Sequence, residues 1–343
     1  MIVTRTPFRV SLFGGGTDYP SWYHEHGGAV IGMAINKYCY ISIRKLPPFF
    51  EHKHRIVYSR IENVREIPEI EHPAVRAILQ EHPPEHGLEI HHDGDLPARS
   101  GLASSSAFTV GLLNALSCMR GQMLSKDFLG REAIRIEQDV IRENVGSQDQ
   151  IWAAHGGFNT IHFNQDGSIA VTPVITPVSR QKELIGSCML FFTGLSRFAS
   201  TIAEKKIANF RNKTQQLHTM RQMVDETHSL LGNPQGDLRD IGRMLHDSWQ
   251  LKRELAEGVT NPEIDAIYNA GMDAGALGGK VLGAGGGGFI LFYVEPDKQE
   301  QVRQRLSPLV QVKFDIDRSG SSVVIYQPEG LEALTIIAAQ VSQ

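Results

Sequence analysis

The sequence predicts an α+β protein built from two domains, residues 1–180 and 181–343. The chain has 343 residues, which suits two domains with a sizeable core. Its start alternates apolar and polar side chains as a strand does, and its second half follows the order strand, three helices, strand, helix, two strands. That order favours a sheet with helices on one face. Pro173 and Pro177 mark the linker between the domains.

In the first domain, apolar periodicity and capping residues predict the remaining elements. Pro73 suits the first turn of a short helix, and Ser125 suits the N-cap of a longer one. The predicted strands cover 1–13, 29–45, 56–58, 88–91, 158–163 and 169–174, and the predicted helices cover 72–80, 104–119 and 126–144.

The second domain opens with an apolar strand and continues with a long polar helix. Asn261 suits the N-cap of its third helix. The predicted elements are a strand at 188–193, helices at 199–231, 238–257 and 262–274, a strand at 289–294, a helix at 297–308, and a strand pair at 311–315 and 322–327.

Composition limits the classes of partner. The chain is 41% hydrophobic and 21% charged with a net charge of −4, which argues against bulk binding to nucleic acid or anionic membranes. No apolar run approaches the roughly 18 residues of a membrane span, and the N-terminus has no signal-peptide core. The three cysteines, Cys39, Cys118 and Cys188, are far apart and suit reduced thiols. We therefore expect a cytoplasmic protein without nucleic-acid or membrane partners; a homo-oligomer is compatible with the sequence.

The serine-rich stretch 95–107 precedes the helix at 104–119. Small side chains there leave the first-turn N–H groups open, and with the helix dipole these groups form an anion site. A phosphate cradle is one interpretation of this stretch. An ordinary capped helix with a tight entry is the other, and the stretch alone favours neither.

Glu137 lies in an apolar stripe at helical spacing together with Ala133 and Val140. A buried carboxylate is costly unless it is paired with a cation or binds one. The stripe therefore indicates a metal ligand, a core salt bridge or a residue at the edge of the stripe. Further along, Asp149 lies in a predicted loop after Gly146, beside amide side chains that can orient it.

Two glycine clusters, at 14–16 and 283–288, allow close approach of the backbone to another group. The second cluster formally matches the Gly-x-Gly-x-x-Gly dinucleotide fingerprint. That fingerprint requires the order strand, glycines, helix, whereas here the glycines precede a strand. We therefore reject it. The sequence also lacks a classical P-loop.

Three motifs occur in a fixed order: Pro7–Pro20, Gly101–Ala107 and Lys280–Phe289. In this order and at these spacings the chain resembles the GHMP kinase superfamily over nearly its whole length. The segments 13–19 and 193–197 are most similar to its heptose 7-phosphate kinase branch. The resemblance implies a ribosomal-protein-S5-like N-terminal domain and a ferredoxin-like C-terminal domain, with ATP, Mg²⁺ and the acceptor meeting between them.

The resemblance also implies a role for each matching residue. Asp149 matches the catalytic aspartate, Arg9 the cation beside it, and Asp18 a sugar-hydroxyl contact. Ala103 departs from the family's usual glycine, which implies a slight change of loop shape. The implied sets are Asp149 and Arg9 for catalysis; Ser100, Gly101, Leu102, Ala103, Ser104, Ser105 and Ser106 for ATP; Ser105 and Glu137 for Mg²⁺; and Gly15, Gly16, Thr17, Asp18, Arg197, Gly285 and Gly286 for the acceptor.

The implied reaction is phosphorylation of the C1 hydroxyl of D-glycero-D-manno-heptose 7-phosphate to the 1,7-bisphosphate, for synthesis of nucleotide-activated heptose and surface polysaccharide. The acceptor's phosphate would need a second anion site, for which Arg197, Lys205 and Lys206 are candidates. Arg197 is the strongest because it follows a buried strand and a glycine turn. The alternatives are a kinase of a free sugar such as fucose, galactose or mannose, and a non-catalytic sugar sensor.

Overall fold

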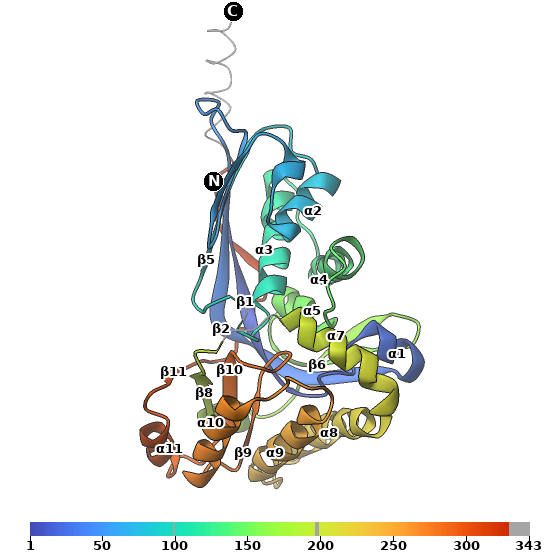
Figure 1. The fold of residues 1–343 in the computed structure, drawn as a ribbon, viewed down its shortest axis with the longest axis vertical. Coiled ribbons are helices and arrows are strands. Elements are labelled where there is room, and N and C mark those ends of the chain that lie inside the picture. The colour runs from blue at the N-terminus through green and yellow to red at the C-terminus, as the bar shows by residue number, and fades with distance from the viewer. Residues whose placement is uncertain (99, 196–198, 329–343) are drawn as a thin grey trace, which may run out of the picture.

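The computed structural model describes residues 1–98, 100–195 and 199–328 and contains two β-sheets (Figure 1). The first sheet has eight strands in the order β12-β1-β2-β5-β3-β4, with β6 and β7 attached through β2. The second has four strands in the order β11-β8-β10-β9. The strands are β1 (Ile2–Phe13), β2 (Gly28–Lys45), β3 (His54–Val57), β4 (Ile61–Val64), β5 (Leu88–Gly94), β6 (Phe158–Phe163), β7 (Ile169–Pro173), β8 (Cys188–Phe192), β9 (Gly278–Val281), β10 (Phe289–Tyr293), β11 (Val310–Val312) and β12 (Ser322–Tyr326).

The long antiparallel pair β1–β2 is the frame of the first sheet. One half of β2 pairs with β6 and the other half with β5. The β1–β2 register shifts between Pro7 and Phe8 and again between Ser11 and Phe13. Bulges of this kind redirect side chains, and Arg9 lies between the two shifts.

The helix α3 (Ser104–Met119) packs against β1 and β2. It is apolar nearly all round and almost wholly buried, as expected for a helix enclosed on every side. In Figure 1, α2 (Pro73–Glu81), α3 and α4 (Lys126–Arg135) lie on one face of the upright strands. The opening of α3 therefore points down toward the second sheet.

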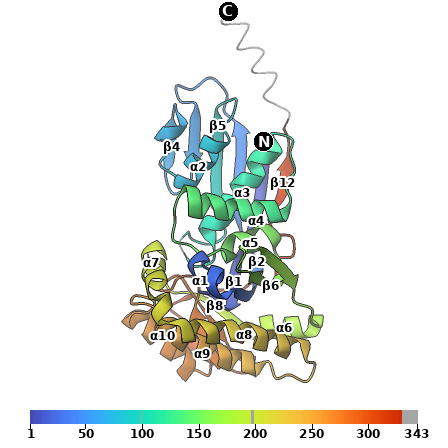
Figure 2. The same cartoon turned by 90° about the vertical axis from the view of Figure 1, so that its right-hand side faces the viewer.

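The second unit surrounds the four-stranded sheet with helices, and α8 and α9 lie together below the first sheet (Figure 2). Side chains of β8 and β10 pack with those of α9 and α10 in a core that includes Phe191, Trp249, Tyr268 and Phe292. Its helices are α7 (Ala199–Asn209), α8 (Thr214–Gly232), α9 (Arg239–Arg253), α10 (Pro262–Asp273) and α11 (Gln299–Arg305).

The predicted pairing of 311–315 with 322–327 is wrong. The strand β11 pairs with β8 in the second sheet, whereas β12 returns to the first sheet and pairs with β1. The strand β12 covers an edge of β1 that would otherwise present unpaired backbone groups. The two sheets are therefore not contiguous in sequence. The domain bounds 1–180 and 181–343 remain a prediction, and residues 322–326 of the predicted second domain pair with the first sheet.

Two predicted helices end early. The helix expected at 199–231 is interrupted by a 3-10 turn, η3 (Phe210–Asn212), where the Phe210 ring packs edge-on against Tyr19 and Trp22. The helix expected at 126–144 keeps its predicted Ser125 cap but gives way to a π-helix, η2 (Ile136–Val140).

Other predicted elements agree, and some elements were not predicted. The predicted first-turn position of Pro73 and the predicted Asn261 cap are confirmed. The helices α1 (Pro20–His26), α5 (Gln148–His155) and α6 (Val178–Gly186) and the strand β9 have patterns too short to be recognised in isolation. Of the helices that the structure describes, none combines the length and apolarity needed to cross a membrane.

Candidate active site

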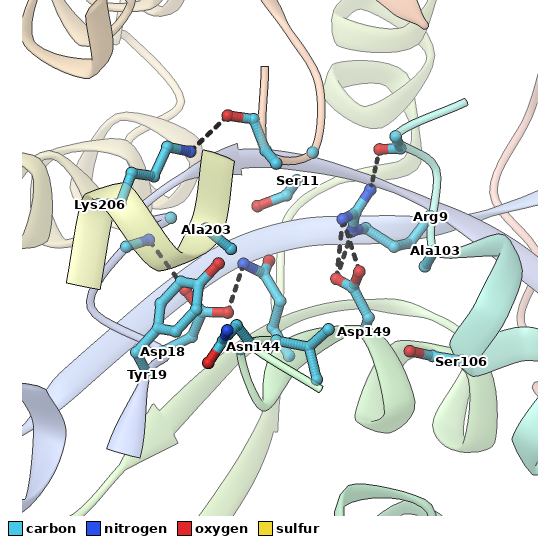
Figure 3. A pocket seen from close by; sticks show the side chains of 18 of the residues that line it. Arg9, Ser11, Asp18, Tyr19, Ala103, Ser106, Asn144, Asp149, Ala203 and Lys206 are labelled. Carbon is cyan, nitrogen blue, oxygen red and sulfur yellow. Dashed lines mark hydrogen bonds and ion pairs between the residues drawn. The ribbon is translucent and has the colours of Figure 1, made fainter. Parts of the chain in front are cut away.

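A pocket lies where the two units meet (Figure 3). Its first wall comes from β1, the loop at 15–19, the opening of α3 and the start of α5. Its second wall comes from α7, α8, α9 and β9 with the loop that follows. Residues far apart in the chain thus converge on one cavity.

Arg9 and Asp149 form a two-pronged ion pair in this pocket. Arg9 Nε donates to Asp149 Oδ1 and Arg9 Nη2 to Asp149 Oδ2, each at 2.9 Å. Arg9 Nη1 also donates to the Gly101 carbonyl at 2.7 Å. The guanidinium is buried, while 28% of the Asp149 side chain stays exposed to the pocket. Arg9 therefore orients the carboxylate without closing off its approach.

Asp149 was predicted to lie in a loop, and the structure corrects this. It lies in the first turn of α5, next to Gln148 and Gln150. A helix of only eight residues shows too little periodicity to be separated from a loop by sequence pattern. A carboxylate in the first turn is also favoured by the helix dipole.

The opening of α3 is shaped by Ala103. Its backbone is left-handed, with φ 70° and ψ 32°, and within the described chain no side chain caps the helix. The Ser106 hydroxyl does not cap the helix but donates to Glu137. The first-turn N–H groups lack partners within the helix, and Ser105 is exposed at the pocket. This opening has the features of the predicted phosphate cradle.

Glu137 lies in the π-helix η2, directly behind Ser106, and is 1% exposed. Its Oε2 accepts from the Ser106 hydroxyl at 2.9 Å and from the Gln150 amide at 2.5 Å. Its Oε1 is buried and has no hydrogen-bond partner among the residues described. Burial raises the pKa of Glu137 to about 7. In the described chain no cation pairs with Glu137, so the salt-bridge interpretation is wrong.

Asp18 is buried in the first wall. Its Oδ1 accepts from the Gly16 amide at 2.9 Å and its Oδ2 from the Gln148 side chain at 2.9 Å. Burial raises the pKa of this carboxyl group. A side chain at Gly146 would meet Asp18 Oδ2 at 2.0 Å, so the chain approaches Asp18 closely there. Gln148 is a site residue that sequence reasoning did not single out.

The glycine cluster at 283–288 packs against the phosphate loop. A Cβ on Gly283 would meet the Gly101 Cα at 2.6 Å, and one on Gly288 would meet the Ser100 carbonyl at 2.1 Å. The Phe289 amide donates to that same carbonyl. The third motif therefore supports the loop by backbone contact.

Several predicted ligand residues lie behind the pocket surface. Gly285 and Gly286 are not among the described residues that line it, because their backbone packs against Val259. Thr17 is buried and its hydroxyl contacts the Gly14 and Ala29 carbonyls, so it stabilises the turn. Ser100 and Leu102 are also buried behind the loop, whereas Gly15, Gly16, Gly101, Ser104 and Ser105 line the pocket.

Three buried lysines form much of the second wall: Lys206, Lys252 and Lys280. Burial lowers the pKa of Lys206 to about 8 and that of Lys280 to about 7, and it lowers the pKa of Lys252 strongly. Of the sequence-predicted anion ligands, Lys206 is buried and lines the pocket, whereas Lys205 is exposed and is not among the described residues that line it, so we leave Lys205 out of the site. Arg197 lies outside the described residues.

Lys252 was missed, although a signal for it exists. It follows Leu245 and Trp249 on the apolar stripe of α9. Lys206 likewise follows Ile202 and Ala203 on α7. A charge within an apolar stripe is the same signal that singled out Glu137.

The residues present fit a nucleotide phosphate and a divalent cation. Glu137 offers a buried carboxylate oxygen without a partner in the described chain, and a hard cation prefers such oxygen ligands. The adjacent α3 opening offers N–H groups to phosphate oxygens. The arrangement can therefore hold a phosphoryl donor next to the Arg9–Asp149 pair.

Comparison with known proteins identifies both halves of the chain. The model described as GHMP kinases N terminal domain matches residues 69–157, and that described as GHMP kinases C terminal matches residues 227–309. The D-glycero-alpha-D-manno-heptose 7-phosphate kinase of Campylobacter jejuni is 28% identical, over 87% of this chain and 91% of that protein. The galactokinase of Pyrococcus furiosus is 26% identical, over 91% and 94% of the two chains.

A crystal structure titled as a D-glycero-D-manno-heptose 1-phosphate kinase from Bacteroides thetaiotaomicron has the same fold. It superposes with a TM-score of 0.77 at 25% identity, and the match covers 95% of this chain and all of that one. The likeness therefore extends over both sheets and the pocket between them.

Proposed function

The chain belongs to the GHMP kinase family and is a sugar kinase, with an alcohol group as acceptor, and from this premise we propose that it phosphorylates the C1 hydroxyl of D-glycero-D-manno-heptose 7-phosphate. ATP is the donor and Mg²⁺ the accompanying cation in this proposal. Two relatives with heptose phosphate kinase in their names support a phosphorylated heptose. The product would be a heptose 1,7-bisphosphate, an intermediate for nucleotide-activated sugar.

The observation that carries the proposal is the Arg9–Asp149 pair at the opening of α3. The acceptor oxygen attacks the γ-phosphorus, the bond to the bridging oxygen breaks, and ADP leaves. Asp149 accepts the hydroxyl proton or orients the hydroxyl for attack, and Arg9 holds this carboxylate in place. Phosphoryl transfer depends mostly on positioning and charge stabilisation, and both are available here.

The other site residues take supporting roles. The α3 amides and the 101–106 loop would hold the triphosphate. Ser105 and Glu137 would hold Mg²⁺, which supplies charge neutralisation of the β- and γ-phosphates when bound. Asp18, held by Gly16 and Gln148, would accept a hydrogen bond from a sugar hydroxyl.

A panel assay tests the proposal. ATP consumption is measured with free sugars and sugar phosphates, and ³¹P NMR identifies the position of the new phosphate. We expect the highest kcat/KM with the heptose 7-phosphate and a new signal at C1. A free sugar as the best acceptor would replace this proposal with the free-sugar kinase that the galactokinase relative supports. No ATP consumption with any acceptor would favour a sensor.

A further inference from the structure

The three lysines of the second wall have no counter-ion among the described residues. Lys206, Lys252 and Lys280 are 5%, 6% and 3% exposed. Within the described ranges none has a carboxylate at ion-pair distance. A buried cation without a counter-ion is strongly unfavourable. Three such cations on one cavity wall therefore indicate a missing anion.

Among the described residues, the hydrogen bonds of each ammonium group go to backbone carbonyls, and the Lys252 ammonium also lies 6.0 Å from the centre of the Trp249 ring. Lys206 Nζ donates to the Ala284 carbonyl at 2.5 Å, and Lys252 Nζ donates to Val281 and Gly283 at 2.6 and 2.7 Å. Lys280 Nζ donates to the Leu12 carbonyl at 2.6 Å. A lysine has three donors, so Lys206 and Lys280 each keep donors that no residue in the described chain accepts. The carbonyls position the ammonium groups without neutralising them.

A fourth polar group lies at the same place. Ser11 lines the pocket and is 7% exposed, and its hydroxyl has no hydrogen-bond partner among the described residues. Ser11 precedes Leu12, whose carbonyl holds Lys280. In the view of Figure 3, Ser11 lies between Lys206 and Arg9. An unpartnered buried hydroxyl in the same pocket as the ammonium groups is a further donor for an anion.

The lysines belong to the acceptor side of the pocket. The charge of Asp18, the residue assigned to the sugar, favours the protonated form of all three lysines, and the charge of Arg9 disfavours it in Lys252 and Lys280 but is not a cause for Lys206. Asp149, by contrast, is engaged by Arg9. The α3 opening, Glu137 and Arg9 already provide for the triphosphate and its cation. The anion that the lysines lack is therefore a second one.

We propose that Lys206, Lys252 and Lys280, with the Ser11 hydroxyl, bind the phosphate group that the acceptor already carries. This inference rests on the proposed function and names the subsite that selects sugar phosphates over free sugars. Burial lowers the pKa of all three lysines, so it disfavours their protonated forms in the ligand-free protein. A phosphate monoester carries about −1.5 to −2 at neutral pH, and its charge would favour the protonated lysines that donate to it.

The test compares Lys206→Met with Lys205→Met. The two lysines are neighbours on α7, and Lys205 is exposed. Lys205→Met therefore removes one lysine from the same helix without changing the pocket, and it serves as the control. With heptose 7-phosphate as acceptor we expect Lys206→Met to raise KM about 10- to 100-fold, as for a lost charge-assisted hydrogen bond. The KM for ATP and the KM for the unphosphorylated heptose should change less than threefold. Lys205→Met should match the wild-type protein.

A second variant guards against misfolding. Lys252→Met replaces a buried cation by an apolar side chain of similar length, which proteins often tolerate, and it should raise the same KM. A rise in the KM for ATP without a rise for the sugar phosphate would overturn the proposal and assign the lysines to the triphosphate. Equal changes for phosphorylated and free heptose would also overturn it, because they indicate a structural role only.

Inorganic phosphate separates this inference from the proposed function. In the wild-type protein we expect it to compete with the sugar phosphate but not with ATP, and to raise the melting temperature less in Lys206→Met. If the panel assay shows no turnover of any sugar phosphate, the proposed function fails. Phosphate binding that is lost in Lys206→Met would still support the anion subsite, and its absence from the wild-type protein would overturn the subsite.

Discussion

The two walls of the pocket differ in the partners of their charged side chains. On the first wall Arg9 and Asp149 neutralise each other, and both carboxylate oxygens of Asp18 accept hydrogen bonds from amides. On the second wall, Lys206 and Lys252 contact backbone carbonyls. The first wall comes from the sheet and helices of the first unit, and the second comes mainly from the helices and loop of the second.

The difference separates two tasks. Paired groups keep their geometry without a ligand, which suits positioning of reacting atoms. Burial disfavours the protonated form of the second-wall lysines, and a bound anion would favour it again. We therefore expect variants of the first wall to change kcat or the metal requirement, and variants of the second wall to change acceptor KM.

The largest effect is expected at the reacting end of the first wall. Asp149→Asn keeps the size of the side chain but removes its basicity. If Asp149 is the general base, kcat should fall about 10²- to 10⁴-fold, while calorimetry should show ATP binding within a few-fold of wild type. Near-normal turnover would contradict the assignment. A fall of only a few-fold would identify Asp149 as an orienting group.

Glu137→Gln should raise the Mg²⁺ concentration needed for half-maximal turnover by about 100-fold, because the metal loses a carboxylate ligand. Even residues that only support the ligands of a metal lower its affinity about 10- to 100-fold when they are replaced. The measurement is a Mg²⁺ titration of ATP turnover. Since Mg²⁺ binds the carboxylate form and burial raises the pKa of Glu137 to about 7, apparent Mg²⁺ affinity should fall as the pH drops through 7. An unchanged titration would contradict the metal role.

Glu137→Gln should also change the thermal stability of the metal-free protein. Because the folded pKa of Glu137 is raised, the folded protein takes up a proton between about pH 4.5 and 7 that the unfolded chain does not. The carboxylate therefore lowers stability fully above pH 7 and progressively less below it. In EDTA, Glu137→Gln should melt higher than wild type at pH 8, and the two should converge near pH 5. Melting temperatures that differ more at pH 5 than at pH 8 would contradict a raised pKa of Glu137 in the folded protein.

Asp18→Asn tests the sugar end of the first wall. Replacing this acceptor with an amide should lower kcat/KM for the sugar phosphate about tenfold or more, the lower end for a hydrogen bond to a charged group. The KM for ATP should not change. Asp166→Asn, in an exposed turn closed by Ser168, is the matched control. Equal losses in both variants would refute a role for Asp18 in acceptor binding.

The smallest effect is expected at Ala103. A left-handed backbone conformation is unfavourable for alanine by roughly 1–2 kcal/mol. Ala103→Gly removes this strain from the folded state, but glycine also makes the unfolded chain more flexible, which offsets part of the gain in stability. We expect the free energy of unfolding to rise by about 0.5–1 kcal/mol in urea denaturation, with activity changed less than threefold. Ala208→Gly, exposed in α7, should instead destabilise by about 1 kcal/mol. A lower free energy of unfolding in Ala103→Gly would contradict backbone strain at Ala103.

Much of the first wall follows from local pattern. The strand at 1–13, the helix at 104–119 and the Ser125 cap are confirmed, because apolar period and capping act between neighbours in the chain. The stripe position of Glu137 also predicted its burial. The resemblance to a kinase family, confirmed by both family models, supplied the roles that pattern alone left open.

Partner choice required the tertiary structure. The local sequence pattern does not predict that β12 pairs with β1 rather than with β11. It also does not predict that Glu137 accepts hydrogen bonds from Ser106 and Gln150 rather than pairing with a cation. Lys205 and Lys206 have the same chemistry and adjacent places on α7, yet one is exposed and the other lines the pocket.

The serine-rich stretch shows both contributions. Its small residues and the helix after them are visible in the sequence and indicate an anion site or a simple cap. Its neighbours are set by the fold: Arg9 reaches the Gly101 carbonyl, and Gly283 packs against Gly101. Periodicity reports which side chains a helix or strand will bury. Only the packing of distant segments decides which charges then face one another, and that determines whether the buried groups form a core or a site.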